Sequence, residues 1–196
     1  VRQCNAETQQ KLVDYLHMGG KLILVGRMCV EDFNHQPCTI LKDAIGIKQI
    51  GGGQPWAGAL IRAFDQIDVP ASFIESFIGD FADRFTFSDK GETVGFIQTI
   101  GAGKVMVFGA TLVVENLDDL TIVDQMAVKM DCPPMFELST WADVRLSQGE
   151  RGSFLFINNY QDDPLDTTIA FQGQKLFSGN PVKLPARTGA ILPLDW

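Results

Sequence analysis

The pattern of apolar and polar positions is clearest in the stretch from Glu7 to Gly26, where it predicts a helix followed by a strand. The apolar residues Leu12, Val13 and Leu16 fall on one face at helical spacing. Asn5 stands where its side chain can cap the first turn of that helix. The spacing therefore predicts an amphipathic helix that covers a core with one face.

The end of the helix and the start of the strand are also marked in this stretch. Gly19 suits the left-handed position that commonly ends a helix. Leu22 to Val25 are then apolar without alternation, a pattern typical of a strand buried on both faces in a parallel sheet. The helix and strand together predict half of a parallel αβ unit.

The rest of the first 136 residues predicts further short elements. Thr39 can begin a short helix that Gly46 ends, and 51–56 reads as a flexible glycine-rich loop. Gly101-Ala102-Gly103 indicates a hairpin turn between two β-rich runs. The remaining predicted elements are strands at 72–77, 84–87, 93–100 and 104–110 and a helix opened by Asp118 and Asp119, with Leu120, Val123, Ala127 and Met130 on one face.

Past Pro134 the pattern changes to short β-rich runs separated by turn residues. The runs are 142–146, 152–158, 167–171 and 189–194. Regular short strands with turn signals favour a small antiparallel β-sandwich. We therefore expect two domains, 1–136 and 137–196.

Composition narrows the possible partners. The chain has 196 residues and a formal net charge of −8, and it lacks the Lys/Arg cluster that a nucleic-acid surface needs. Its apolar runs are far shorter than the roughly 20 residues of a membrane span. We expect neither nucleic acid nor a membrane as a partner. Because no strand precedes the first helix, we expect an α/β domain without its first strand in a fragment of a larger polypeptide. The compartment, cytoplasmic or secreted, is left open.

Cys29 occupies the position where an α/β fold places a nucleophile, just past the first strand. A nucleophile elbow needs small flanking residues, and Met28 and Val30 flank this cysteine. The acidic pair that follows would raise the pKa of the thiol. We therefore predict no catalytic residue on this chain, with a divergent Cys-dependent amidotransferase as one alternative.

Metal and cofactor signatures are equally weak. Cys29, His35 and Cys38 lack a fourth ligand at regular spacing, so we expect no metal site. Gly101 to Lys104 lacks both the earlier glycine and the Ser or Thr of a phosphate-binding loop, so we expect no cofactor.

Two tryptophans are weak candidates for carbohydrate binding. A sugar ring can stack on the flat apolar face of Trp56 or Trp141. Packing in a core or an interface explains tryptophans more often. A carbohydrate-binding accessory module therefore stands as a second alternative.

Several stretches of core and turn residues resemble the C-terminal portion of large bacterial β-galactosidases of glycoside hydrolase families 42 and 35. They are ETQQKLVDYLHMGGKLILVGRM with HQPCTILKDAIGI, VGFIQTIGAGKVMVFGA, and VRLSQGERGSFLFINNY with LPARTGAILPLDW. The resemblance implies an amidotransferase-like α/β domain and a terminal β-sandwich. It also implies that the two catalytic glutamates belong to a barrel absent from this chain.

We therefore predict a flavodoxin- or class I glutamine amidotransferase-like three-layer α/β domain followed by a small antiparallel β-sandwich. The expected role is structural, without catalysis on this chain. The expected partners are the catalytic barrel of a parent β-galactosidase, a further copy in a homo-oligomer, and possible β-galactosides or oligosaccharides.

Overall fold

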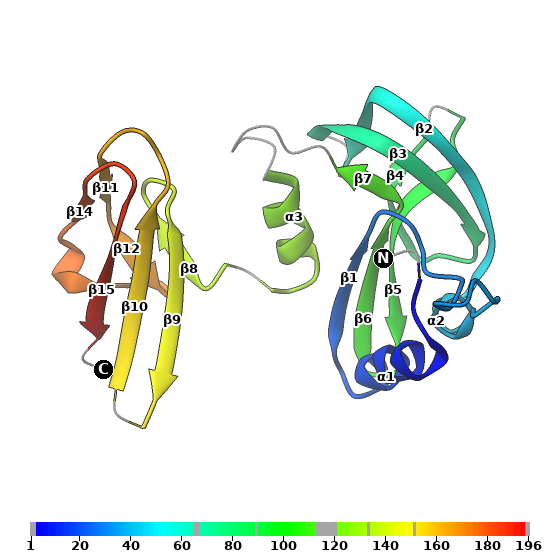
Figure 1. The fold of residues 1–196 in the computed structure, drawn as a ribbon, viewed down its shortest axis with the longest axis horizontal. Helices are drawn as coiled ribbons and strands as arrows, with labels where there is room; N and C mark the ends of the chain where they lie inside the picture. Colours follow the sequence, from blue (N-terminus) through cyan, green and yellow to red (C-terminus); the bar gives the residue numbers. More distant parts are fainter. Residues whose placement is uncertain are drawn as a thin grey trace. The chain divides into compact units, whose positions relative to one another are not determined.

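The computed structural model describes residues 3–64, 67–88, 90–112, 121–132, 134–150 and 152–194, without the side chains of 53–60, 67–70 and 121. Contacts divide the chain into two compact units, Val1–Pro133 and Pro134–Trp196 (Figure 1). No helix in the described ranges is long and apolar enough to cross a membrane.

The first unit is built around one curved sheet. Its elements are α1 (Ala6–His17), β1 (Lys21–Val25), α2 (Ile40–Ile45), β2 (Ile47–Ala63), β3 (Ile67–Gly79), β4 (Asp83–Phe87), β5 (Thr93–Ile100), β6 (Gly103–Phe108), β7 (Ala110–Leu112) and α3 (Thr121–Lys129). The strand order is β1-β6-β5-β4-β2-β3-β7, and β3 also pairs with β5. Figure 1 shows β1, β6 and β5 side by side and the long β2–β3 hairpin curving beside β4.

The predicted three-layer flavodoxin- or amidotransferase-like α/β class is wrong, because the fold is β-rich. In the described part of the sheet β1 and β6 form a parallel pair, and the other pairs are antiparallel. Parallel neighbours need long crossovers, usually through a helix, whereas short turns join antiparallel neighbours. From Ile47 to Leu112 the chain uses turns and hairpins, so the αβ pattern of its start is not repeated.

The predictions for α1 and its ends are confirmed, but the predicted burial of β1 is wrong. Asn5 Oδ1 accepts a hydrogen bond from Thr8 N at 2.8 Å, and Gly19 has a φ of 97°. In β1 the apolar side chains alternate: Leu22 and Leu24 pack against the core, whereas Ile23 and Val25 are 39% and 42% exposed. β1 is an edge strand, so a continuous apolar run did not mean burial on both faces.

The predicted glycine-rich loop at 51–56 is also wrong, because these residues continue β2. The register between β2 and β3 shifts at Gly52, which has a φ of 80°. A Cβ at Gly51 would come within 2.8 Å of Ser76 Oγ, and one at Gly52 within 3.0 Å of Ile74 O. The glycines thus allow a bulge and a close approach of β3.

Two apolar clusters lie on opposite faces of β6. Val105 and Val107 belong to the cluster that contains the buried face of α1, and Met106 and Phe108 to the cluster that contains α3. The predicted apolar face of α3 is partly wrong, since Val123 is exposed. The buried residues here are Ile122 and Met126 of α3 and Met130 directly after it, and the predicted start of the helix at 118–120 lies outside the described residues.

The second unit consists of short antiparallel strands. Three of the predicted runs match single strands, whereas the predicted run 167–171 is divided between β11 and β12, which belong to different sheets. Its elements are β8 (Phe136–Leu138), β9 (Asp143–Gly149), β10 (Gly152–Asn159), β11 (Leu165–Thr167), β12 (Ile169–Phe171), β13 (Gln174–Lys175), the 3-10 turn η2 (Phe177–Gly179), β14 (Val182–Leu184) and β15 (Thr188–Leu194). They form the sheets β15-β10-β9, β11-β14 and β13-β12-β8. Leu155 and Ile157 of β10 are fully buried in a core of their own.

Candidate functional site

The loop after β1 holds Cys29 in a buried environment that favours the protonated thiol. Burial raises the pKa of the Cys29 thiol, and the nearby Cys4 thiol raises it further. Met28 N donates a hydrogen bond to Glu75 Oε2 at 2.8 Å, and the Arg27 guanidinium lies 4.0 Å from the centre of the Phe73 ring. Because the thiolate is the nucleophilic form, a raised pKa makes Cys29 a poor nucleophile.

Neither described histidine forms a hydrogen bond with Cys29. His35 lies on the loop, with Nδ1 2.9 Å from Gln3 Nε2 and 3.3 Å from Glu31 Oε2. His17 ends α1. A Cys–His catalytic pair requires both groups within hydrogen-bond reach, so this loop does not support the amidotransferase alternative.

The same loop is held by a fully buried glutamine. Gln9 Nε2 donates to Cys4 O at 3.0 Å and to Cys38 O at 2.9 Å, and Gln9 Oε1 accepts from Leu41 N at 3.0 Å. One side chain of α1 thus joins the entry to α1, the loop after β1 and the start of α2. In the described residues no group of three His, Cys, Asp or Glu side chains is arranged to hold a metal ion.

The two tryptophan candidates belong to different units. Trp56 is in β2, and its side chain lies outside the described residues. Trp141 precedes β9 and is 41% exposed, and its carbonyl accepts a hydrogen bond from Gln161 Nε2 at 3.2 Å. Trp141 is therefore the candidate with a described side chain.

An exposed tyrosine, Tyr160, directly precedes Gln161, whose side chain donates to the Trp141 carbonyl. Tyr160 is 57% exposed, and its hydroxyl donates to Asp143 Oδ2 at 3.3 Å. Asn158 Nδ2 donates to the same oxygen at 3.1 Å, and Arg145 Nε to Asp143 Oδ1 at 3.2 Å. We call this set, with Trp141, the Trp141–Tyr160 surface.

Hydrogen bonding keeps the carboxyl group of this surface ionised. Burial opposes ionisation of Asp143, but hydrogen bonds from Arg145, Asn158 and Tyr160 outweigh it and hold the pKa below its usual value. The sequence signal for Tyr160 was its place two residues after the predicted 152–158 strand. The pairing of Asn158 with Asp143 across β10 and β9 is what brings the segment of Tyr160 back to the segment of Trp141.

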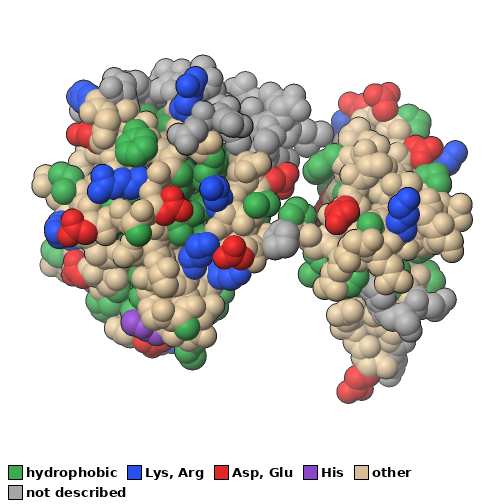
Figure 2. Space-filling view, turned by 180° about the vertical axis from the view of Figure 1, so that it is seen from behind, with side chains coloured by type: hydrophobic (Ala, Val, Ile, Leu, Met, Phe, Trp, Pro, Cys, Tyr) green, Lys and Arg blue, Asp and Glu red, His purple; other side chains and the backbone are tan. Residues whose placement is uncertain are grey.

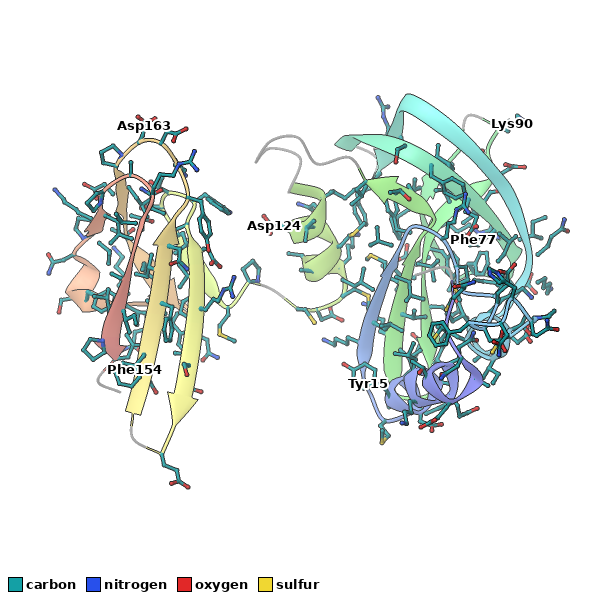
Figure 3. All side chains as sticks on the ribbon, viewed as in Figure 1. Tyr15, Phe77, Lys90, Asp124, Phe154 and Asp163 are labelled. Carbon is teal, nitrogen blue, oxygen red and sulfur yellow. The ribbon has the colours of Figure 1, made fainter. Side chains whose placement is uncertain are left out.

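A second feature of this unit is an exposed apolar sheet face. Phe154 and Phe156 of β10 and Ile191 of β15 are exposed, and Phe156 and Ile191 are direct partners across the two strands. We call these three residues the outer sheet face. Figure 3 labels Phe154 on β10, and Figure 2 shows apolar side chains reaching the surface between interspersed acidic and basic ones.

Comparison with known proteins gives one family model and several solved structures. Residues 2–76 match the model described as GLMA-like, second domain. No curated protein matches the chain.

Several of the matching solved structures are β-galactosidases. A catalytic mutant of Gan42B, a GH42 β-galactosidase from G. stearothermophilus, aligns with a TM-score of 0.73 and 13% identity over 98% of this chain and 30% of its own. The β-galactosidase from Bacillus circulans sp. alkalophilus gives 0.71 and 12% over 98% and 31%. That from the haloarchaeon Halorubrum lacusprofundi gives 0.66 and 17% over 100% and 30%.

The chain therefore spans about 30% of the length of these proteins, and what the low identity shows is a shared fold. Gan42B is described as a member of family GH42, whereas the resemblance to family 35 stays a prediction. Across both of its units, the chain has the fold of one part of a β-galactosidase related in structure to family GH42.

Proposed function

We propose that this chain is the non-catalytic C-terminal portion of a β-galactosidase-like glycoside hydrolase, with a structural role beside a catalytic barrel. The observation that carries the proposal is the structural match, which covers nearly all of this chain but only about 30% of each β-galactosidase. A match of this extent leaves most of each relative, including space for a barrel, outside the aligned part. The domain division 1–136 and 137–196 belongs to the same proposal.

The carboxyl groups of the described residues support a role without catalysis. Retaining glycosidases pair a carboxylate nucleophile with an acid whose pKa is raised. Four described carboxyl groups have a pKa that is shifted downward, and hydrogen bonds from neighbouring donors lower it. These are Asp43, Asp80, Asp131 and Asp143. Such groups are held ionised, so none of them suits the role of the acid.

The outer sheet face supports a role in assembly. Its three apolar side chains lie together on the exposed side of the β15-β10-β9 sheet. Exposed apolar patches commonly mark interfaces, and an interface with the barrel or with another copy would remove these side chains from water.

The proposal is tested by assaying two proteins with an aryl β-galactoside. The clean 196-residue chain should show no turnover, whereas the polypeptide encoded by its whole reading frame should contain a barrel and be active. In that longer protein Phe156→Ser should lower the thermal midpoint more than Lys183→Ser, a matched change at an exposed position. Activity of the chain alone, or a reading frame without a barrel, would overturn the proposal.

The Trp141–Tyr160 surface favours carbohydrate binding as a second candidate. It combines two exposed aromatic rings with an ionised carboxylate and amide groups, which suit stacking on a sugar and hydrogen bonding to its hydroxyls. Galactose and short β-galactosides titrated to millimolar concentration should shift the tryptophan fluorescence. Trp141→Ala should abolish the shift, and Phe154→Ala should leave it unchanged. Absence of any shift removes this candidate.

A further inference from the structure

The Trp141–Tyr160 surface lies on the outward side of the β15-β10-β9 sheet, whose strands Figure 1 shows side by side. Ala142 and Asn159 are buried, so the residues on either side of each point outward, because side chains alternate along an extended chain. Across the sheet Asp143 of β9 is the partner of Asn158 of β10, and Asn158 is the partner of Gly189 of β15. We call Asp143, Asn158 and Gly189 the polar row.

Gly189 gives the side chain of Asn158 its place in the polar row. A Cβ at Gly189 would come within 2.5 Å of Asn158 Oδ1. The φ of Gly189 lies outside the left-handed region, so the backbone itself does not require glycine there. The room beside Gly189 lets Asn158 Nδ2 reach Asp143 Oδ2 at 3.1 Å, and no described residue donates to Asn158 Oδ1.

Arg145 adds hydrogen-bond donors that its ion pair does not use. Its Nε donates to Asp143 Oδ1 at 3.2 Å, and its side chain is 72% exposed. In the described part of the chain neither Nη atom of Arg145 has an acceptor. A sugar hydroxyl can donate and accept at once, so it can donate to Asn158 Oδ1 or Asp143 and accept from Arg145. These groups lie on the same outward surface as two exposed aromatic rings.

The charge of Asp143 distinguishes neutral sugars from acidic ones at this surface. Burial raises the pKa of Asp143, but hydrogen bonds from Arg145, Asn158 and Tyr160 outweigh it and hold the pKa below its usual value. The carboxylate therefore stays ionised at neutral pH, neutralises Arg145, and is still 21% exposed. A ligand carboxylate that approaches Arg145 meets a like charge, which is costly at an interface, whereas the hydroxyl of a neutral sugar can donate to the same oxygen atoms.

We propose that the Trp141–Tyr160 surface selects neutral galactosides against galacturonosides, with Asp143 as the specificity-determining residue and Gly189 as the residue that positions Asn158 beside it. The inference rests on the second candidate function, carbohydrate binding, and names the class of sugar that this site takes. The two classes of sugar have the same ring and the same ring hydroxyls. They differ in the exocyclic group, which is a hydroxymethyl in the galactoside and a carboxylate in the galacturonoside.

The test titrates the full chain with methyl β-galactoside and methyl β-galacturonoside at neutral pH and follows tryptophan fluorescence. The galacturonoside should bind about tenfold more weakly or worse, since a like charge at an interface costs at least that factor. Asp143→Asn removes the like charge and leaves Arg145 without its carboxylate partner, so the preference should disappear or reverse. Asp166→Asn is the matched control, because Asp166 is an exposed carboxylate of the same unit that pairs with Lys183 at 3.5 Å. It should leave the preference unchanged.

A glycine variant tests the positioning of Asn158 separately. Gly189→Ala should displace the Asn158 side chain, weaken galactoside binding about tenfold, and raise the pKa of Asp143 in an NMR titration, because one donor is lost. Gly149→Ala, whose Cβ meets open space on the same sheet, should change neither quantity.

The possible outcomes separate the inference from the candidate function on which it rests. No fluorescence shift with either sugar overturns both. Equal affinity for the two sugars, a preference for the galacturonoside, or a preference that survives Asp143→Asn overturns the inference alone. An unchanged pKa of Asp143 and unchanged binding in Gly189→Ala overturn the role of Gly189.

Discussion

Replacing Gln9 with leucine should destabilise the first unit strongly, because Gln9 is a buried polar side chain with three backbone partners. Its amide contacts Cys4 O, Cys38 O and Leu41 N at 2.9–3.0 Å, and the residue is fully buried. Leucine keeps most of the volume but can make none of these bonds. Three backbone groups from three segments would lose their partner.

The size of the effect follows from these contacts. A typical hydrogen bond contributes about 1 kcal/mol net, and a buried group left without a partner costs about 1–3 kcal/mol. Three lost bonds therefore predict a loss of about 3 kcal/mol or more in the free energy of unfolding. The matched control is Gln10→Leu, since Gln10 is an exposed neighbour whose side chain donates to Asp14 Oδ1 at 2.9 Å. A surface change of this kind should stay within about 0.5 kcal/mol.

Urea unfolding measures the difference if the signal reports on the first unit alone. Trp141 and Trp196 belong to the second unit, so replacing both with phenylalanine leaves Trp56 as the fluorescent tryptophan. With an m-value of about 2 kcal/mol/M, Gln9→Leu should lower the midpoint by about 1.5 M. Equal midpoints for Gln9→Leu and Gln10→Leu would refute the reasoning.

Three further outcomes follow from the structure. Iodoacetamide at neutral pH should alkylate the exposed Cys132 first. The buried Cys29, whose thiol pKa is raised, should react only on unfolding. Mass spectrometry of digests measures the order of labelling, and early labelling of Cys29 would contradict this prediction. Because the folded pKa of Asp143 is lowered, the stability that its carboxylate contributes is present above the unfolded pKa and is lost as the pH falls through the folded pKa. In a plot of thermal midpoint against pH, Asp143→Asn should therefore flatten the fall at acid pH. An unchanged fall would contradict the hydrogen-bond network. A Cβ at Gly103 would overlap the carbonyl oxygens of Leu16 and Gly20, so Gly103→Ala should lower the free energy of unfolding by about 1–3 kcal/mol. Gly149→Ala, at a position with open space, should leave it unchanged. Calorimetry measures both, and equal effects would contradict the close approach at Gly103.

The ends of the helices could be predicted from the residues next to them in the sequence. Asn5, Gly19 and Gly46 stand where the pattern placed them because a cap depends on a few neighbouring residues. The same holds for the hairpin between β5 and β6 at Gly101. These features need no knowledge of distant strands.

Features that depend on distant partners were not predictable from the pattern. The apolar run 22–25 indicates a buried strand, but Ile23 and Val25 are exposed because their side chains alternate to the face opposite Leu22 and Leu24, which pack on the core. Gly51 and Gly52 indicate a loop, but β3 approaches too closely there for a Cβ. The three-layer class failed for the same reason, since one αβ unit does not fix how later strands pair.

The candidate site divides in the same way. The sequence predicted a raised pKa for the Cys29 thiol from the acidic pair that follows it, whereas in the structure burial and the Cys4 thiol raise that pKa. Trp141 could be singled out by residue type, but Tyr160 and Asp143 join it only through the pairing of β9 with β10. A surface assembled across strands is not visible in sequence spacing.

We propose that this chain contributes structure and not catalysis to a β-galactosidase-like enzyme. Steady-state hydrolysis of p-nitrophenyl β-galactoside by the clean chain tests it most directly. We predict no turnover above buffer at any protein concentration. Turnover that co-elutes with the chain and rises in proportion to its concentration would contradict the claim.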